Sequence, residues 1–107
     1  MNKKRRHQIE EQIRKIKQEL QGLGEMRPGS LTRQYRVPKD KIGPYYQISY
    51  THKMKSRTEY IRPQFVKQVR SQIAKYKRFK KLVEKWIQLG IEHSKLTMKL
   101  AKLKDKK

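Results

Sequence analysis

The fold is decided by residues 45–63, whose sequence is YYQISYTHKMKSRTEYIRP. Aromatic and β-branched residues alternate with polar ones over residues 45–51, which predicts a β-strand with one buried face. Residues 57–61 predict the returning strand, and residues 52–56 predict the connection of a hairpin. Because a lone hairpin is only marginally stable in water, one face of this sheet has to rest on a helix.

The segment before the hairpin predicts a further short strand and several breaks in the chain. Apolar and polar residues alternate over residues 31–37 in the pattern of a half-buried strand. Residues 27–30 predict a turn, residues 37–41 predict a loop, and Gly43-Pro44 predicts another break. The expected sheet is therefore antiparallel, with two or three strands.

Two amphipathic helices flank this region of the sequence. Residues 7–21 carry one stripe with the spacing of a coiled coil, and Gly22 and Gly24 end it. Pro63 stands at the natural first position of a second helix, and no proline follows it. At Gly90 this long helix could bend or break, since glycine costs about 1 kcal/mol in a helix interior. The stripe of the first helix consists of Ile9, Ile13, Ile16, Leu20 and Leu23.

These elements predict an α+β fold. It comprises an N-terminal helix, a small antiparallel sheet, and a long basic C-terminal helix that runs antiparallel to the first. We expect one domain with three segments: an amphipathic helix with a basic start (1–24), a turn and hairpin module (25–62), and a long basic helix with a lysine-rich tail (63–107).

The net charge of the chain limits the classes of binding partner that it suits. It carries 30 Lys and Arg against 9 Asp and Glu in 107 residues, a formal net charge of +21, whereas a small domain needs a net charge of only about 2–8 to remain soluble. Such an excess is tolerable when a polyanion neutralises it, and nucleic acid is the polyanion most often met. A highly soluble helical protein with solvated charges is the alternative. A membrane surface is a weaker one, because basic residues interrupt every apolar stretch.

The basic residues form a face on the second helix. No acidic residue occurs between Ile61 and Val83, and on a helical wheel the lysines and arginines lie largely opposite the apolar stripe. We therefore expect phosphate contacts on this face and on the basic hairpin, with Tyr45 pointing away from the core as a stacking residue. The predicted nucleic-acid-binding residues are Lys53, Lys55, Arg57, Arg62, Lys67, Arg70, Lys77, Arg78, Lys81, Lys85 and Tyr45.

Nothing in the sequence indicates an enzyme. Hydrophobic residues make up 34% of the chain, below the roughly 45–50% of ordinary domains, so the core is too small to enclose a deep pocket. There is no cysteine, His7, His52 and His93 lack partners at metal-ligand spacing, and no glycine-rich phosphate loop is present. We predict no catalytic residue, no metal and no cofactor. The lack of a signal peptide or a membrane-spanning run predicts a cytoplasmic protein without a membrane partner.

Five short elements occur in an order that is typical of a known family. They are Gly29-Ser30-Leu31, Gln34-Tyr35-Arg36, Gly43-Pro44-Tyr45-Tyr46, Ser49-Tyr50 and Tyr60-Ile61. In this order they resemble a domain-of-unknown-function family of short basic bacterial and archaeal proteins, over roughly residues 27–89. The resemblance implies a hairpin followed by a long basic helix. It also implies a nucleic-acid setting, since members are often encoded near transposases and other mobile elements.

The chain departs from this family at one place. Members usually have a cysteine cluster between the second and third elements, which resembles a zinc knuckle. Here residues 37–42 replace the cluster without any cysteine, and we predict no zinc.

The expected function is that of a non-catalytic nucleic-acid-binding accessory subunit in a mobile-element or RNA-guided nucleoprotein complex. RNA is favoured over DNA, because tyrosines on a basic sheet suit unpaired bases and no recognition-helix motif is evident. The alternative is a coiled-coil adaptor that binds an acidic protein, either a larger protein of the same system or a second copy. The second helix is expected to extend beyond the first and to offer an interface, formed by Trp86, Leu89, Leu96, Leu100 and Leu103.

Overall fold

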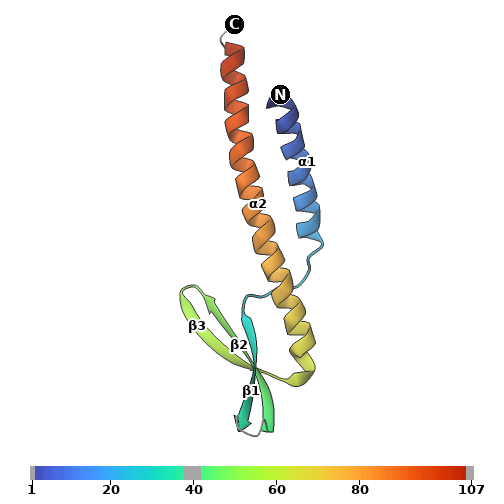
Figure 1. Cartoon of the computed structure of the whole chain (residues 1–107), viewed down its shortest axis with the longest axis vertical. Coiled ribbons are helices and arrows are strands. Elements are labelled where there is room, and N and C mark those ends of the chain that lie inside the picture. The colour runs from blue at the N-terminus through green and yellow to red at the C-terminus, as the bar shows by residue number, and fades with distance from the viewer. Residues whose placement is uncertain (1, 38–41, 106–107) are drawn as a thin grey trace. The chain divides into compact units, whose positions relative to one another are not determined.

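The computed structural model describes residues 2–37 and 42–105. It has the predicted α+β fold (Figure 1), in which a three-stranded sheet stands between two helices in the chain. Contacts divide the chain into two compact units, which we call the sheet unit (Gly24–Arg78) and the helical unit (Met1–Leu23 with Phe79–Lys107). The elements are α1 (Asn2–Gln21), β1 (Ser30–Val37), β2 (Ile42–His52), β3 (Lys55–Ile61), a 3-10 turn (Pro63–Phe65) and α2 (Val66–Asp105), and α2 contributes to both units.

The sheet is antiparallel with the order β1-β2-β3, so the third strand is present. Ile48 lies at its centre, opposite Leu31 on β1 and Glu59 on β3. Its side chain is fully buried, and with Ile61 it packs against the first turns of α2. The alternation of residues 45–51 therefore places one face of the sheet against the helix, as expected for a sheet this small. The remaining members of this core are Val66, Val69, Ile73, Leu31 and Tyr46.

The hairpin turn is tighter than the sequence predicts. The connection comprises only Lys53 and Met54, and both have a positive φ, of 51° and 65°. A two-residue turn of this kind matches the right-handed twist of the flanking strands. The left-handed conformation costs a residue with a Cβ about 1–2 kcal/mol, so this turn is strained by its own side chains.

The predicted break at Gly43-Pro44 is wrong, because both residues belong to β2. Pro44 is paired with Tyr35 of β1, whereas the pairing of β2 with β3 begins only at Tyr46 and Ile61. At Pro44 the strand therefore has a neighbour on one side only. Proline lacks a backbone N–H, and at such an edge position the missing donor costs no hydrogen bond of the sheet. Residues 38–41 of the predicted loop lie outside the described residues.

In the helical unit, α1 runs antiparallel to α2. Ile9 and Ile16 of α1 form a buried cluster with Leu82 and Leu89 of α2. The helix begins at Asn2 rather than at the predicted His7. Its extra turn carries Arg5, which forms a two-pronged ion pair with Glu92 at 2.6 and 3.1 Å.

Helix α2 is continuous from Val66 to Asp105 and passes through Gly90 without interruption. The prediction that α1 leaves Trp86, Leu89 and Leu96 uncovered is corrected, because all three pack in the cluster with α1. The first turns of α2 pack on the sheet within the sheet unit. Its later turns pack on α1 within the helical unit. Beyond this cluster Leu100 is half-buried and Leu103 is 54% exposed.

Candidate nucleic-acid interface

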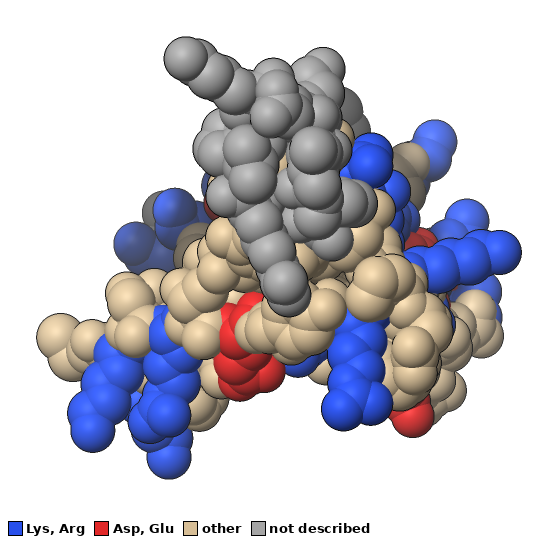
Figure 2. All heavy atoms as spheres, turned by 90° about the horizontal axis from the view of Figure 1, so that it is seen from below, with Lys and Arg blue, Asp and Glu red and all other residues tan. Residues whose placement is uncertain are grey.

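The first turns of α2 present a row of basic side chains in the sheet unit. Lys67, Arg70 and Lys77 are exposed, and their spacing places them on one side of the helix. Arg78 is exposed beside them, and no acidic residue interrupts the sequence between residues 61 and 83. In the view of Figure 2, Lys and Arg side chains stand around the visible face and Asp and Glu side chains are few. We call Lys67, Arg70 and Lys77 the basic row.

A groove of about 350 Å³ separates the basic row from the start of β1. Arg70 and Lys77 line one wall, and Gly29, Ser30 and Leu31 line the other. A Cβ on Gly29 would lie 2.7 Å from Cγ1 and Cδ1 of Ile48, and its φ of 145° is one that glycine alone adopts readily. Glycine at this position therefore lets the strand close over the core, with Ser30 beside the groove. The groove combines the cations of Arg70 and Lys77, a pair that suits a phosphate oxygen.

The basic hairpin residues lie on the helix-facing side of the sheet. Lys55 pairs with His52 and Arg57 pairs with Tyr50, and both follow the phase of Ile48. The side chains of the four predicted hairpin cations, Lys53, Lys55, Arg57 and Arg62, are exposed. Lys55 and Arg57 therefore lie near the hairpin turn, on the same face of the sheet as the buried Ile48.

Tyr50 is engaged by neighbouring polar groups. Its hydroxyl donates a hydrogen bond of 2.6 Å to Glu59, and this bond, with some loss of hydration, raises the pKa of Tyr50 above its usual 10.0. The guanidinium of Arg27 lies 5.1 Å from the centre of the Tyr50 ring and 3.8 Å from Glu59. These contacts occupy Tyr50 and neutralise Glu59, the acidic residue of β3.

Over residues 30–34, 45–51 and 56–60, the opposite face of the sheet carries uncharged polar and aromatic side chains. Tyr45 lies there, with its ring centre 6.4 Å from that of Tyr60 and the two ring planes inclined at 36°. Hydroxyl pairs join the strands, at 3.3 Å between Ser49 and Thr58 and at 3.0 Å between Thr51 and Ser56. We call this surface the hydroxyl face, and its residues are Ser30, Thr32, Gln34, Tyr45, Gln47, Ser49, Thr51, Ser56, Thr58 and Tyr60.

A second groove, of about 370 Å³, opens where the hydroxyl face meets the start of α2. Tyr60 and Phe65 line it and are 58% and 46% exposed. Arg62, a predicted binding residue, lines the same groove. Neither Tyr60 nor Phe65 is among the binding residues predicted from the sequence. The phase of β3 could have placed Tyr60 with Tyr45, and the position of Phe65 before the first full helical turn could have separated it from the apolar stripe.

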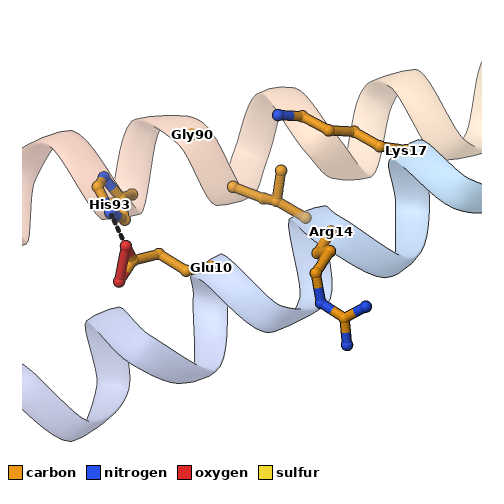
Figure 3. Close-up of a pocket in the computed structure, with 6 residues that line it drawn as sticks. Glu10, Arg14, Lys17, Gly90 and His93 are labelled. Carbon is orange, nitrogen blue, oxygen red and sulfur yellow. Dashed lines mark ion pairs between the residues drawn. The ribbon is translucent and has the colours of Figure 1, made fainter.

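The helical unit carries a different kind of surface. Lys81 and Lys85 are exposed on α2. A groove of about 330 Å³ beside Gly90 (Figure 3) contains the ion pair of Glu10 and His93, at 3.7 Å. Gly90 leaves this groove open, because a Cβ there would meet nothing within 4 Å. The mixture of charges makes it a poor anion site. The other residues that line it are Ile13, Arg14 and Lys17.

Within each unit, the structure groups the predicted binding residues as follows. In the sheet unit, the early turns of α2 carry Lys67, Arg70, Lys77 and Arg78, and the hairpin carries Lys53, Lys55 and Arg57. The groove lined by Tyr60 and Phe65, which we call the aromatic groove, has Arg62 and Tyr45 nearby. The helical unit contains Lys81 and Lys85. The described residues contain no cluster of three His, Asp or Glu side chains at metal-binding positions. None of the helices within the described ranges is both long and apolar enough to cross a membrane.

Comparison with known protein families shows which family the chain matches. The family model described as "Domain of unknown function (DUF6788)" matches residues 6–71, more than half of the chain. The matched segment includes most of α1, the whole sheet and the start of α2 as far as Ser71. No curated protein and no solved structure matches the chain.

Proposed function

The chain belongs to the family of the domain of unknown function DUF6788, and we propose that it is a non-catalytic nucleic-acid-binding protein that grips phosphates. The observation that carries the proposal is the basic row of Lys67, Arg70 and Lys77, of which Arg70 and Lys77 line a groove. The row lies in a segment of the sequence, residues 62–82, that contains no acidic residue. A row of like charges is unfavourable at neutral pH unless an anion lies against it. A polyanion with regularly spaced charges is the ligand that such a row suits best.

The length of the basic row supports an extended ligand. Lys67 and Lys77 are ten residues apart, or about 15 Å along the helix at 1.5 Å per residue. One strand of a duplex carries a phosphate about every 3.4 Å along its axis. The row therefore spans about four phosphates of one strand, with Arg70 between its ends.

We propose an accessory role in a mobile-element or RNA-guided nucleoprotein complex as the setting. The support is the resemblance described above, since members of that family are often encoded near transposases. RNA is favoured over DNA, because tyrosines on the sheet suit unpaired bases. The absence of the family's cysteine cluster means that this chain would bind without a zinc knuckle.

A salt titration with a matched pair of variants tests the proposal. Log affinity is expected to fall with log salt by about 0.7–0.9 for each phosphate contacted. Replacing Lys67, Arg70 and Lys77 with glutamine should lower this slope by the contribution of about two to three phosphate contacts. Replacing Lys95, Lys99 and Lys102, which removes the same charge from the helical unit, should change it by less than one contact. Salt-independent binding, or equal losses in the two triple variants, would contradict the proposal.

A second function, that of an adaptor, is favoured by another observation. Ile87, Ile91 and Met98 are 57%, 53% and 62% exposed on α2, and their spacing of four and seven residues places them on one side of the helix. Lys95 and Lys102 flank this apolar seam, so a second copy would meet like charges, whereas an acidic amphipathic helix would not. The seam is expected to bind a leucine-seamed peptide flanked by glutamates. Leu100 and Leu103 of the predicted interface lie on the other side of α2, in line with Leu89 and Leu96. Undiminished binding by the double variant Ile87→Gln and Ile91→Gln would exclude the seam as the site.

A further inference from the structure

We propose that the groove between Tyr60 and Phe65 binds an unpaired base, which makes single-stranded nucleic acid the preferred ligand of this protein. The inference rests on the proposed function, because it names the class of nucleic acid that the basic surfaces hold. The groove is lined by two exposed rings and by polar side chains.

The first observation is the exposure of two aromatic rings beside a well-packed core. Tyr60 is 58% and Phe65 is 46% exposed, although Ile61 and Val69 in the same groove are 8% and 7% exposed. The aliphatic residues thus form the floor of the groove, and the rings stand above it. Rings that served only to cover the core would be expected to bury most of their surface, as Ile61 and Val69 do.

The second observation is the chemistry of the groove and its surroundings. The groove has a volume of about 370 Å³, and Gln68 and Arg62 supply its polar lining. An amide can donate and accept hydrogen bonds at the edge of a base, and an arginine at the rim can hold the adjoining phosphate. Flat apolar walls with a few polar groups are the features by which proteins hold splayed-out bases.

The third observation is that the aromatic surface continues onto the hydroxyl face. Tyr45 lies 6.4 Å from Tyr60, centre to centre, and Gln47 and Thr58 surround the two rings with uncharged polar groups. Two rings in succession suit stacking by successive bases, which every base can provide because each has a π-face. A duplex keeps its bases stacked on one another and presents only their edges, so it cannot use these rings.

Competition between two ligands of equal phosphate number tests the inference. We would compare a labelled single-stranded oligouridylate with an RNA hairpin of the same charge, by fluorescence anisotropy at one fixed salt concentration. The two strands of the hairpin are joined by a non-nucleotide linker, so that it contains no unpaired base. The unmodified protein should prefer the single strand. Replacing Tyr60 and Phe65 with leucine should weaken single-strand binding by about 5- to 150-fold per lost stack, and should change hairpin binding by less than twofold.

Tyr60→Phe is the matched control, because it keeps the ring and should keep the preference. The fold of each variant can be followed by the signal of Trp86, the sole tryptophan, together with the tyrosine signals of the sheet unit. Equal affinity of the unmodified protein for single strand and hairpin would overturn this inference while leaving phosphate binding intact. Absence of binding to both ligands would instead overturn the proposed function.

Discussion

Gly29→Ala is expected to destabilise the sheet unit strongly. The added Cβ would lie 2.7 Å from two carbon atoms of Ile48, a side chain with 0% exposure at the centre of the sheet core. Overpacking of a core costs about 1–3 kcal/mol, and holding a residue with a Cβ at a φ of 145° costs about 1–3 kcal/mol more. We therefore expect a loss of about 2–6 kcal/mol, which is a large part of the stability of a small domain.

The measurement is equilibrium unfolding in urea, followed by two signals that separate the units. All six tyrosines lie between residues 35 and 76 in the sheet unit, and the one tryptophan lies in the helical unit. The tyrosine transition should move to lower urea concentration in the variant. Gly90→Ala is the matched control, because a Cβ there meets nothing within 4 Å, and it should stabilise the chain by about 0.5–1 kcal/mol.

A double-mutant cycle isolates the clash from the backbone strain. Ile48→Val removes Cδ1, one of the two atoms that the new Cβ would meet, so the cost of Gly29→Ala should fall by about 0.5–1.5 kcal/mol, half of the overpacking cost. An unchanged cost would show that the close approach of Gly29 to Ile48 is not what requires glycine. A tyrosine transition unaffected by Gly29→Ala alone would refute the whole argument.

Three further outcomes are expected. Met54→Gly should stabilise the chain by about 1 kcal/mol in urea unfolding, because it relieves a positive φ of 65° at an exposed turn residue; a loss of stability would contradict the strain. The ion pair with Arg5 lowers the pKa of Glu92 below its usual 4.5, so the pair stabilises the chain fully above pH 4.5 and loses its effect as the pH falls through the lowered pKa. In thermal melts between about pH 5 and pH 3, Glu92→Gln should therefore lose less stability than the unmodified chain. Parallel curves of the two proteins would count against the ion pair. Glu59→Gln should bring the pKa of Tyr50 back toward 10.0, since its hydrogen bond to Glu59 is the main cause of the raised value, and an ultraviolet titration in which the high-pH tyrosine does not move would argue against that bond.

Local patterns in the sequence predict the elements of this fold well. The alternation around Ile48 identifies the core face of β2, and the spacing of Ile9 and Ile16 identifies the buried face of α1, because both patterns follow directly from backbone geometry. The break predicted at Gly43-Pro44 fails for a non-local reason. Whether proline is tolerated in a strand depends on how many neighbours the strand has at that point, and only the register of all three strands determines this.

The sequence does not predict which distant segments of the chain pack against each other. The apolar stripe of α2 runs without a gap, so the sequence does not say which part meets the sheet and which part meets α1. That choice assigns Val69 to one core and Leu89 to the other. It also decides which rings remain exposed, so the groove lined by Tyr60 and Phe65 could not be predicted. The exposure of Lys67, Arg70 and Lys77 could be predicted, because it follows from their charge.

Helix α2 contributes residues to two separate cores, and this affects the order in which the two cores form during folding. The core of the sheet unit is formed within the continuous segment Gly24–Arg78, whereas the ion pair of Arg5 and Glu92 joins residues 87 positions apart. Contacts that are close in the sequence form faster, because they close shorter loops. The sheet should therefore form first and hold the opening turns of α2, which removes the cost of nucleating that helix. α1 then docks on a helix that is already growing, so in rapid-mixing experiments the tyrosine signals should precede that of Trp86.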